Sequence, residues 1–193
     1  MSPRVVAIVQ ARCSSTRLPG KVLADIMGAP MLARVIQRLQ KCERLDEIVV
    51  ATTQHRDDDP IIEATQDTSV LRHRYRGNPG DVLSRYVSAA RFHCADVVVR
   101  VTADCPLLDP GVVDRTVESL LERPYVDYAS NVLERTYPRG LDAEVLWLDT
   151  LLRLDRHATS QEDREHVTRY LLHSHRPWFT THSVTQHCGI NMG

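Results

Sequence analysis

Residues 10–21 carry the densest set of chemically active side chains in this sequence of 193 residues. Three basic and three hydroxyl-bearing residues lie there: Arg12, Arg17, Lys21, Ser14, Ser15 and Thr16. No acid occurs before Asp25, and Lys21 is one of only two lysines among 24 basic residues. Guanidinium forks, an ammonium group, hydroxyls and backbone N–H groups together bind the oxygens of a polyphosphate. The segment predicts a triphosphate-binding loop, with a solvated basic loop as the alternative.

A second polar loop follows the apolar run 97–101 and carries Asp104 close to the end of that run, just as residues 10–21 follow the apolar run 5–9. Ligands of open α/β sheets bind beyond the carboxyl ends of the strands, so we expect both loops at one edge of a sheet. Magnesium is usually held by one or two carboxylates together with substrate phosphates. Asp104 is therefore a candidate magnesium ligand, and the alternative is a turn residue before Cys105.

Apolar runs bounded by turn residues alternate with segments of helical period along the chain. The expected strands are residues 5–10, 46–52 and 97–101, with further candidates at 127–131, 143–147 and 178–184. The expected helices are residues 31–39, 81–92, 111–122, 150–156 and 163–173, and residues 56–60 read as the start of another. This alternation predicts an α/β fold with a mostly parallel central sheet and helices on both faces. No linker or repeat divides the chain, so we expect residues 1–193 to form a single domain.

The charge balance restricts the classes of partner. Lys plus Arg number 24 and Asp plus Glu number 25, which gives a formal net charge of -1. The chain therefore lacks an overall field for DNA or RNA, and we expect no nucleic-acid partner. Five scattered cysteines without a Cys-x-x-Cys pair indicate reduced thiols. No apolar run approaches the length of a secretory signal or a membrane span, so we expect a cytoplasmic protein without a membrane partner.

Two further groups of titratable side chains each admit two interpretations. Glu165 and His166 form a candidate acid/base pair, whereas the acids at 162–165 also suit the first turn of a helix capped by Ser160. Histidines and a cysteine gather near the C-terminal end: His173, His175, His182, His187 and Cys188. Their spacing matches no zinc motif, so we interpret them as a solvated polar tail.

Five ordered blocks of the sequence carry a family resemblance. They are Gln-Ala-Arg at 10–12 with Arg-Leu-Pro-Gly-Lys at 17–21, Arg-Gly at 76–77 with Asp-Val-Leu-Ser-Arg-Tyr at 81–86, Val-Thr-Ala-Asp-Cys-Pro-Leu at 101–107, Thr-Tyr-Pro-Arg-Gly-Leu-Asp-Ala-Glu at 136–144, and Asp-Arg-Glu-His-Val-Thr at 163–168. Over residues 5–172 the chain resembles cytidylyltransferases of the spore-coat polysaccharide type. These are relatives of the acylneuraminate and CMP-KDO synthetases among the Rossmann-like nucleotidyltransferases.

The resemblance implies that CTP and a sugar-acid-like or related acceptor give a CMP-linked product and pyrophosphate. It implies nucleotide-binding residues, which are Ala11, Arg12, Ser15, Arg17, Lys21, Gly77, Asp81 and Arg85. Arg12, Lys21 and Asp104 would be catalytic, with Mg²⁺ as cofactor on Asp104. It places the acceptor against Asn131, Tyr137, Arg139, Asp142 and Glu144. A homodimer is expected through residues 125–147, because that region reaches a partner subunit in the relatives.

The sequence departs from the family at its C-terminal end and leaves alternatives open. Relatives continue with an Arg-x-Thr-Val-Asp-like segment whose Asp can complete the metal site, whereas this sequence ends at Gly193. Asp142, Glu144 or Glu165 would then substitute as a second metal ligand. One alternative is a nucleotide-sugar-dependent glycosyltransferase, for which the Asp-x-Asp string at 57–59 is a candidate metal motif that precedes a helix. Another is a catalytically inactive nucleotide-binding relative. A keto-sugar acid, a neutral sugar derivative and a phosphonate are all compatible as acceptors.

Overall fold

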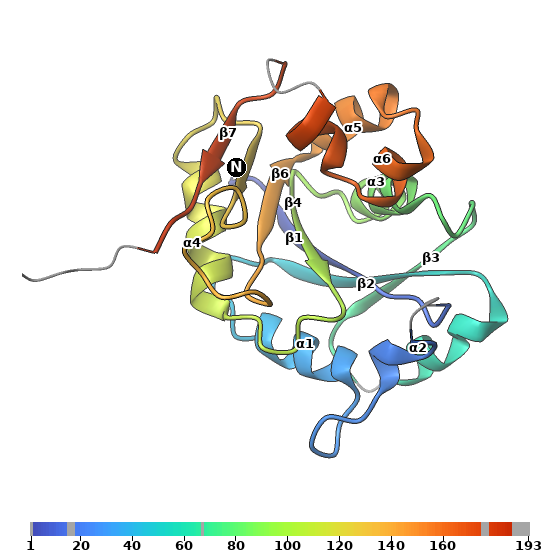
Figure 1. Cartoon of the computed structure of the whole chain (residues 1–193). Helices are drawn as coiled ribbons and strands as arrows, with labels where there is room; N and C mark the ends of the chain where they lie inside the picture. The colour runs from blue at the N-terminus through green and yellow to red at the C-terminus, as the bar shows by residue number, and fades with distance from the viewer. Residues whose placement is uncertain (1, 15–17, 67, 175–177, 187–193) are drawn as a thin grey trace, which may run out of the picture.

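A computed structural model describes residues 2–14, 18–66, 68–174 and 178–186. Within these ranges the strands form one seven-stranded sheet in the order β3-β2-β1-β4-β6-β5-β7 (Figure 1). The strands are β1 Val5–Gln10, β2 Glu47–Thr53, β3 Leu71–Tyr75, β4 Val97–Thr102, β5 Tyr128–Ser130, β6 Glu144–Trp147 and β7 Thr181–Ser183. The β1, β2, β3 and β4 strands are parallel, whereas β6 runs antiparallel to β4 and β5. The predicted mostly parallel sheet is confirmed.

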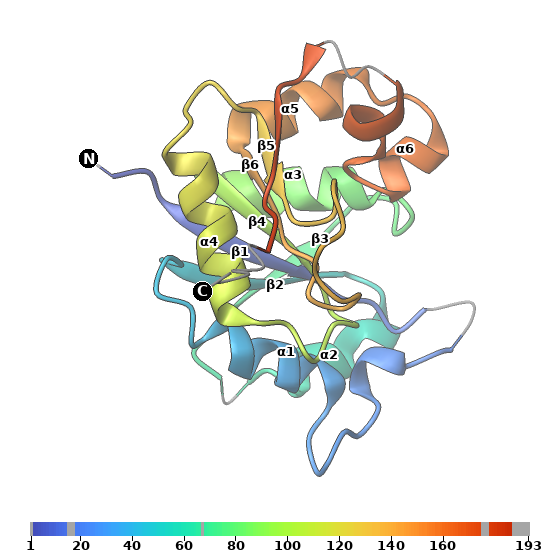
Figure 2. The same cartoon turned by 60° about the vertical axis from the view of Figure 1, so that its left-hand side comes forward.

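Both faces of the sheet are covered by helices, as the apolar composition of the central strands requires. On one face α1 (Met31–Leu39) and α4 (Pro110–Leu121) pack against alternate residues of β1, and on the other α3 (Val82–Phe92) and α5 (Leu148–His157) cover the remainder (Figures 1 and 2). Ala7 belongs to the first core and Ile8 to the second, and both side chains are fully buried. This α/β sandwich therefore holds β1 rigidly from both sides.

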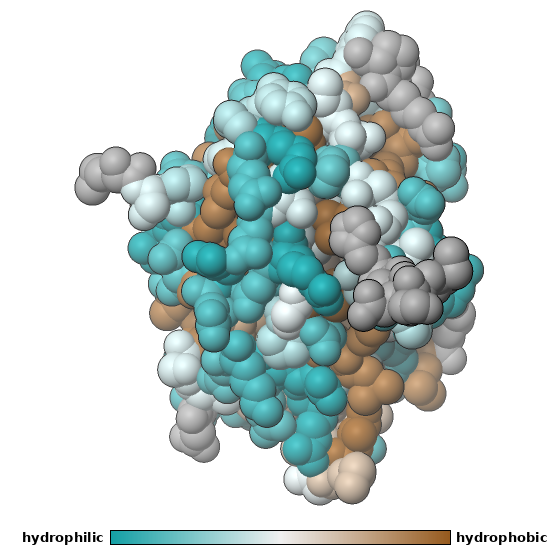
Figure 3. Space-filling view, turned by 90° about the vertical axis from the view of Figure 1, so that its left-hand side faces the viewer, coloured by the Kyte–Doolittle hydropathy of each residue, from teal (hydrophilic) through white to brown (hydrophobic). Residues whose placement is uncertain are grey.

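The short helical segments complete the described chain. They are η1 Lys21–Leu23, η2 Arg56–Asp58, α2 Asp59–Glu63, α6 Gln161–Glu165 and the π-helical turn η3 Tyr170–Ser174. The face that carries α4 is mainly hydrophilic, with apolar strips beside it (Figure 3). Among the described helices, none combines the length and the apolar character needed to cross a bilayer.

Side-chain caps fix where three helices begin. Asp81 accepts a hydrogen bond from the Ser84 N–H at 3.0 Å and starts α3, and Asp109 accepts one from the Val112 N–H at 3.0 Å and starts α4. Ser160 likewise accepts from the Asp163 N–H at 3.1 Å and starts α6. Each such cap contributes about 1 kcal/mol of stability. The predicted cap at Ser160 is confirmed.

Two parts of the secondary structure differ from the sequence prediction. The edge strand β3 was not predicted, because its residues are largely polar and three of its five residues are exposed. The single helix predicted over 163–173 is wrong, since α6 ends at Glu165 and the backbone of Val167 turns to a φ of 39°. A left-handed residue cannot continue an α-helix.

Candidate active site

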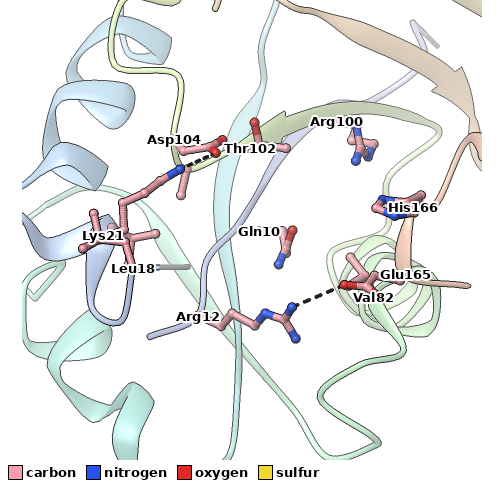
Figure 4. Close-up of a pocket in the computed structure, with 12 residues that line it drawn as sticks. Gln10, Arg12, Leu18, Lys21, Val82, Arg100, Thr102, Asp104, Glu165 and His166 are labelled. Carbon is pink, nitrogen blue, oxygen red and sulfur yellow. Dashed lines mark hydrogen bonds and ion pairs between the residues drawn. The ribbon is translucent and has the colours of Figure 1, made fainter. Parts of the chain in front are cut away.

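A cavity of about 390 Å³ opens at the carboxyl ends of β1 and β4 (Figure 4). It is lined by Gln10, Arg12, Leu18, Lys21, Val22, Val82, Arg100, Thr102, Ala103, Asp104, Glu165 and His166. Gln10 and Thr102 are the last residues of two adjacent parallel strands, which pair at this position. The two loops singled out in the sequence therefore meet at one edge of the sheet, as predicted from the parallel topology.

A buried carboxylate holds the loop that follows β1. Asp58 is 2% exposed and accepts a hydrogen bond from the Cys13 N–H at 2.7 Å, and its other oxygen accepts from the hydroxyl of Thr53 on β2. The Gly20 N–H then donates to the Cys13 carbonyl at 2.9 Å, which closes the loop before Lys21. Sequence reasoning treated Asp58 only as one of three acids at a helix start. Its role depends on contacts across 45 residues, for which the sequence carries no local signal.

Lys21 and Asp104 form an ion pair across the cavity mouth, with Nζ 2.8 Å from Oδ2. Their side chains are 35% and 43% exposed, so this pair remains in contact with solvent. Burial raises the pKa of Asp104, but the hydrogen bonds from Lys21 and Thr102 outweigh it and hold the pKa below its ordinary value. The carboxylate is therefore ionised at neutral pH. An incoming phosphate can replace it as the partner of Lys21 at little cost, because exposed ion pairs are weak.

Arg12 reaches across the cavity toward a different acid. Its Nη2 lies 3.6 Å from Oε1 of Glu165, at the end of α6, and its Nη1 donates to the Pro79 carbonyl at 3.4 Å. The side chain is 27% exposed. Two cations predicted to bind a triphosphate thus each face a carboxylate that a phosphate group can displace.

Arg85 lies behind Arg12 and is fully buried. Its Nη2 donates to the same Pro79 carbonyl at 2.5 Å, while its Nε and Nη1 have no hydrogen-bond partner among the described residues. Burial, followed by the charge of Arg12, lowers the pKa of Arg85. Arg85 is absent from the described cavity lining, so it bears on the site through Arg12 and Pro79.

The other predicted nucleotide-binding residues have structural contacts in this chain. Asp81 caps α3 and accepts from Arg164 Nε at 2.7 Å, while the Ala11 N–H donates to Ala51 at 3.1 Å. Gly77 is required where it stands, because a Cβ there would clash with the Tyr75 ring. Two further predicted residues, Ser15 and Arg17, lie outside the described ranges.

The predicted acceptor residues are absent from the described lining of the cavity. Asn131 closes its own loop, donating to the Leu141 carbonyl at 2.8 Å and accepting from the Ala143 N–H at 2.9 Å. Asp142 pairs with Arg135 at 3.0 Å. The remaining two differ in burial, since Tyr137 is 9% exposed and packs in the core, whereas Arg139 is exposed.

Glu144 acts from behind the cavity wall. It pairs with Nη1 of Arg100, which lines the cavity, and its second oxygen accepts hydrogen bonds from the Tyr128 hydroxyl at 2.9 Å and the Thr168 hydroxyl at 2.7 Å. Burial lowers the pKa of Arg100, but the Glu144 charge outweighs it and the pKa is raised above its ordinary value. Arg100 is therefore a permanent cation held in one orientation.

The structure separates the two interpretations of the acids at 162–165. Glu162 and Asp163 occupy the first turn of α6, which suits the positive end of a helix. Glu165 and His166 instead lie at its C-terminal end and line the cavity. Val167 follows with a φ of 39° although its side chain is β-branched, a conformation that costs about 1–3 kcal/mol. The local fold therefore tolerates strain next to the cavity.

Asp104 fits the way in which proteins hold Mg²⁺ beside a nucleotide. The ion usually keeps several waters and takes one or two carboxylates plus substrate phosphates. Asp104 lies at the end of β4 with the Thr102 hydroxyl beside it, opposite the cationic loop. The described residues contain no cluster of three or more metal-ligating side chains, so an all-protein metal cage is absent from that part of the chain. The donor set suits an ion that arrives with phosphates.

The family pattern described as "Cytidylyltransferase" matches residues 6–187 of this chain. The chain belongs to the cytidylyltransferase family. The resemblance noted in the sequence is thus confirmed, and the chain stands among CTP-dependent cytidylyltransferases.

Relatives among curated proteins differ in how much of their length this cytidylyltransferase chain spans. It is 37% identical over 168 residues to "Uncharacterized protein MJ1063" of Methanocaldococcus jannaschii, covering 87% of this chain and 67% of that protein. It is 31% identical over 172 residues to the spore coat polysaccharide biosynthesis protein SpsF of Bacillus subtilis, covering 86% and 69%. It is 35% identical over 122 residues to the 3-deoxy-manno-octulosonate cytidylyltransferase of Geobacter sulfurreducens, covering 63% of this chain and 47% of that protein.

Solved structures support the same assignment. A cytidylyltransferase from Leptospira borgpetersenii matches with a TM-score of 0.90 at 30% identity, covering 96% of this chain and 77% of that one. A CMP-2-keto-3-deoxy-manno-octonic acid synthetase complexed with CTP matches with a TM-score of 0.72 at 20% identity, covering 95% and 90%. The second likeness concerns the fold alone. Together they confirm the nucleotidyltransferase fold of this cytidylyltransferase.

Proposed function

We propose that this cytidylyltransferase transfers CMP from CTP to a sugar-acid-like acceptor and releases pyrophosphate. The observation that carries the proposal is the cavity at the ends of β1 and β4, where Arg12 and Lys21 face Asp104 and Glu165. Cations on one wall, each paired with a displaceable carboxylate, suit a polyanion that binds and leaves in every cycle. Family membership supplies the nucleotide, since the matched pattern is that of cytidylyltransferases.

Arg12 and Lys21 would bind the triphosphate and stabilise the charge that grows as pyrophosphate leaves. Their backbone supports are rigid, because β1 is buried on both faces and the following loop is held by Asp58. Preorganised donors of this kind are usually the largest single contribution to catalysis of such transfers. Arg17 and Ser15 complete the proposed loop.

Asp104 would hold Mg²⁺ through its carboxylate once a phosphate takes over Lys21. When bound, the ion would neutralise charge on the phosphate oxygens. The nucleobase would lie toward residues 77–85, where the Pro79 carbonyl is already approached by Arg12 and Arg85. A backbone carbonyl fixed by two guanidinium groups is a rigid hydrogen-bond acceptor for an exocyclic amine.

The acceptor class follows from the relatives rather than from the cavity alone. One relative is named for 3-deoxy-manno-octulosonate and another for spore coat polysaccharide biosynthesis, so we place this chain in the supply of activated sugars for polysaccharides. Arg100 offers a fixed cation on the wall of the cavity, which suits an acidic acceptor. The residues predicted earlier, such as Arg139 and Asp142, would then shape the outer approach.

A glycosyltransferase is less well supported. Its candidate metal string at 57–59 lies in η2 and at the start of α2, where Asp58 is buried against the loop and Asp59 pairs with Arg74. Neither carboxylate is part of the described cavity lining. A nucleotide-binding relative without catalysis remains the second candidate, and it would bind CTP without releasing pyrophosphate.

A homodimer and a cytoplasmic location belong to the same proposal. In residues 125–147, Tyr125 is 75% exposed and offers an apolar contact, while Tyr128 and Tyr137 are turned into the core. Two-fold dimers are the commonest assemblies of soluble proteins. Light scattering at micromolar concentration tests the dimer, and a monomeric mass would refute it.

Pyrophosphate release measured with each of the four NTPs tests the proposed function. The acceptor panel is 3-deoxy-manno-octulosonate, a neutral hexose and a phosphonate, each with Mg²⁺. We expect release with CTP and the sugar acid, and several kcal/mol of discrimination against other bases, since unmatched polar groups in a base site are left unpaired. Equal thermal stabilisation by all four NTPs would contradict the choice of CTP, and CTP binding without release would favour the inactive relative.

A further inference from the structure

His166 enters the cavity from a segment that has no role in the proposed nucleotide binding. It lines the cavity from the end of α6, on the side opposite Lys21 (Figure 4). The charged groups that line the same cavity are Arg12, Lys21, Arg100, Asp104 and Glu165. His166 is exposed, so its imidazole is reached by both a bound substrate and water.

The backbone around His166 is fixed on both sides. Its N–H donates to the Glu162 carbonyl at 3.0 Å, and its carbonyl accepts from the Arg169 N–H at 3.0 Å. The next residue, Val167, is fully buried with a φ of 39°, and then Thr168 donates to the buried Glu144. The strained turn therefore buries its neighbours and leaves the imidazole facing the cavity. Backbone strain of this kind persists only where the surrounding structure enforces it.

The other polar groups of the described cavity lining are poorly suited to accept a proton. Arg12, Lys21 and Arg100 are already cations, and Arg100 is further committed to Glu144. The two carboxylates are paired, Asp104 with Lys21 and Glu165 with Arg12. Gln10 and Thr102 have no basic atom. An imidazole is the side chain that exchanges a proton near neutral pH, and it acts most often as the general base in enzymes.

We propose that His166 is the general base for the acceptor hydroxyl, an inference that rests on the proposed CMP transfer. The oxygen of the acceptor hydroxyl attacks the α-phosphorus of CTP and forms the new O–P bond. The bond from that phosphorus to the bridging oxygen breaks, and its electron pair leaves with pyrophosphate. The hydroxyl proton passes to the free ring nitrogen of His166 and from there to water, which reaches the exposed imidazole. The acceptor therefore lies between Arg100 and His166.

The test compares His166→Gln with His173→Gln in pyrophosphate release from CTP. His173 is exposed on the following turn and is not among the described lining residues, so it serves as the matched control. We expect His166→Gln to lower kcat by about 10²–10⁴-fold, the usual contribution of general-base catalysis, while KM for CTP changes less than about 3-fold. The fall of kcat on the acid side of the pH profile should disappear in His166→Gln and persist in His173→Gln.

A merely structural His166 would give a different pattern. Unchanged kcat in His166→Gln, or a lowered kcat with the acid limb retained, would overturn the proposal. Carbethoxylation by diethylpyrocarbonate, mapped by mass spectrometry, gives a readout that needs no turnover. CTP with Mg²⁺ should slow the modification of His166 and leave His173 unaffected. Equal modification with and without CTP would overturn the proposal, whereas absence of pyrophosphate release by the wild-type enzyme would instead refute the proposed function.

Discussion

Two ion pairs at the ends of β4 have similar chemistry and different surroundings. Arg100 and Glu144 have side chains that are 14% and 11% exposed, and Glu144 takes further hydrogen bonds from Tyr128 and Thr168. Lys21 and Asp104 are 35% and 43% exposed. Water can replace the partner of an exposed charge but not that of a buried one, so the first pair is part of the fold and the second is available to substrate.

The comparison separates residues that hold the site from residues that act in it. Glu144 was predicted to contact the acceptor, and the structure places it behind Arg100 with both oxygens occupied. Lys21 was predicted to contact phosphate, and its partner is a solvent-exposed carboxylate. Burial of the partner therefore distinguishes the two roles where residue type does not.

The largest effect on stability is expected from breaking the buried pair. Arg100→Met leaves Glu144 buried without its cation, and removal of one partner of such a pair costs about 3–5 kcal/mol. Urea unfolding measures the loss. The double variant Arg100→Met with Glu144→Leu should recover most of it, because the uncompensated charge is gone. A single variant as stable as wild type would show that the pair is not part of the fold.

Asp104→Asn should abolish most magnesium-dependent turnover while the protein stays folded. The change keeps size and hydrogen bonding and removes the charge expected to hold Mg²⁺, which is worth several kcal/mol of transition-state stabilisation. Asp109→Asn is the matched control, because it removes a charge from the same loop at a helix cap where Asn serves about as well. Magnesium-dependent pyrophosphate release for both variants decides the matter, and similar losses would mean that the metal lies elsewhere.

Lys21→Ala should lower turnover by about 10², the effect of removing one preorganised charge donor. Its cost in stability should stay below about 1 kcal/mol, since exposed ion pairs contribute little. Steady-state kinetics and urea unfolding on the same sample test both halves. Turnover near that of wild type in a folded Lys21→Ala would remove the loop from the triphosphate site.

The smallest effect is expected at a pair of intermediate burial, Asp81 with Arg164, whose side chains are 21% and 22% exposed. Burial raises the pKa of Asp81, but hydrogen bonds from Arg164 and Ser84 outweigh it and lower the pKa. A lowered folded-state pKa stabilises the protein above the unfolded pKa of about 4 and is lost as pH falls through the folded value. Asp81→Asn should therefore cost about 1 kcal/mol at pH 7 and nothing in acid. Urea midpoints at the two pH values measure it, and an equal cost at both would exclude the charge as the cause.

The sequence alone determined the layers of the fold and the edge where the site lies. Buried runs such as 5–10 and 97–101 have no polar alternation, so they had to be central strands, and parallel connection brings their carboxyl ends together. The cluster of Arg12, Arg17 and Lys21 was visible because it is local in sequence. Its placement at the cavity follows from the strand that precedes it, except for Arg17, which lies outside the described residues.

Only the tertiary structure decided which polar residues are supports and which face the cavity. Asp58, Asp81 and Glu144 are acids whose partners lie 45, 83 and 44 residues away, and no local pattern reports such contacts. His166 faces the cavity because α6 stops and Val167 takes a left-handed conformation that no propensity favours. Local periodicity specifies elements, whereas burial and charge pairing depend on which distant elements the fold brings into contact.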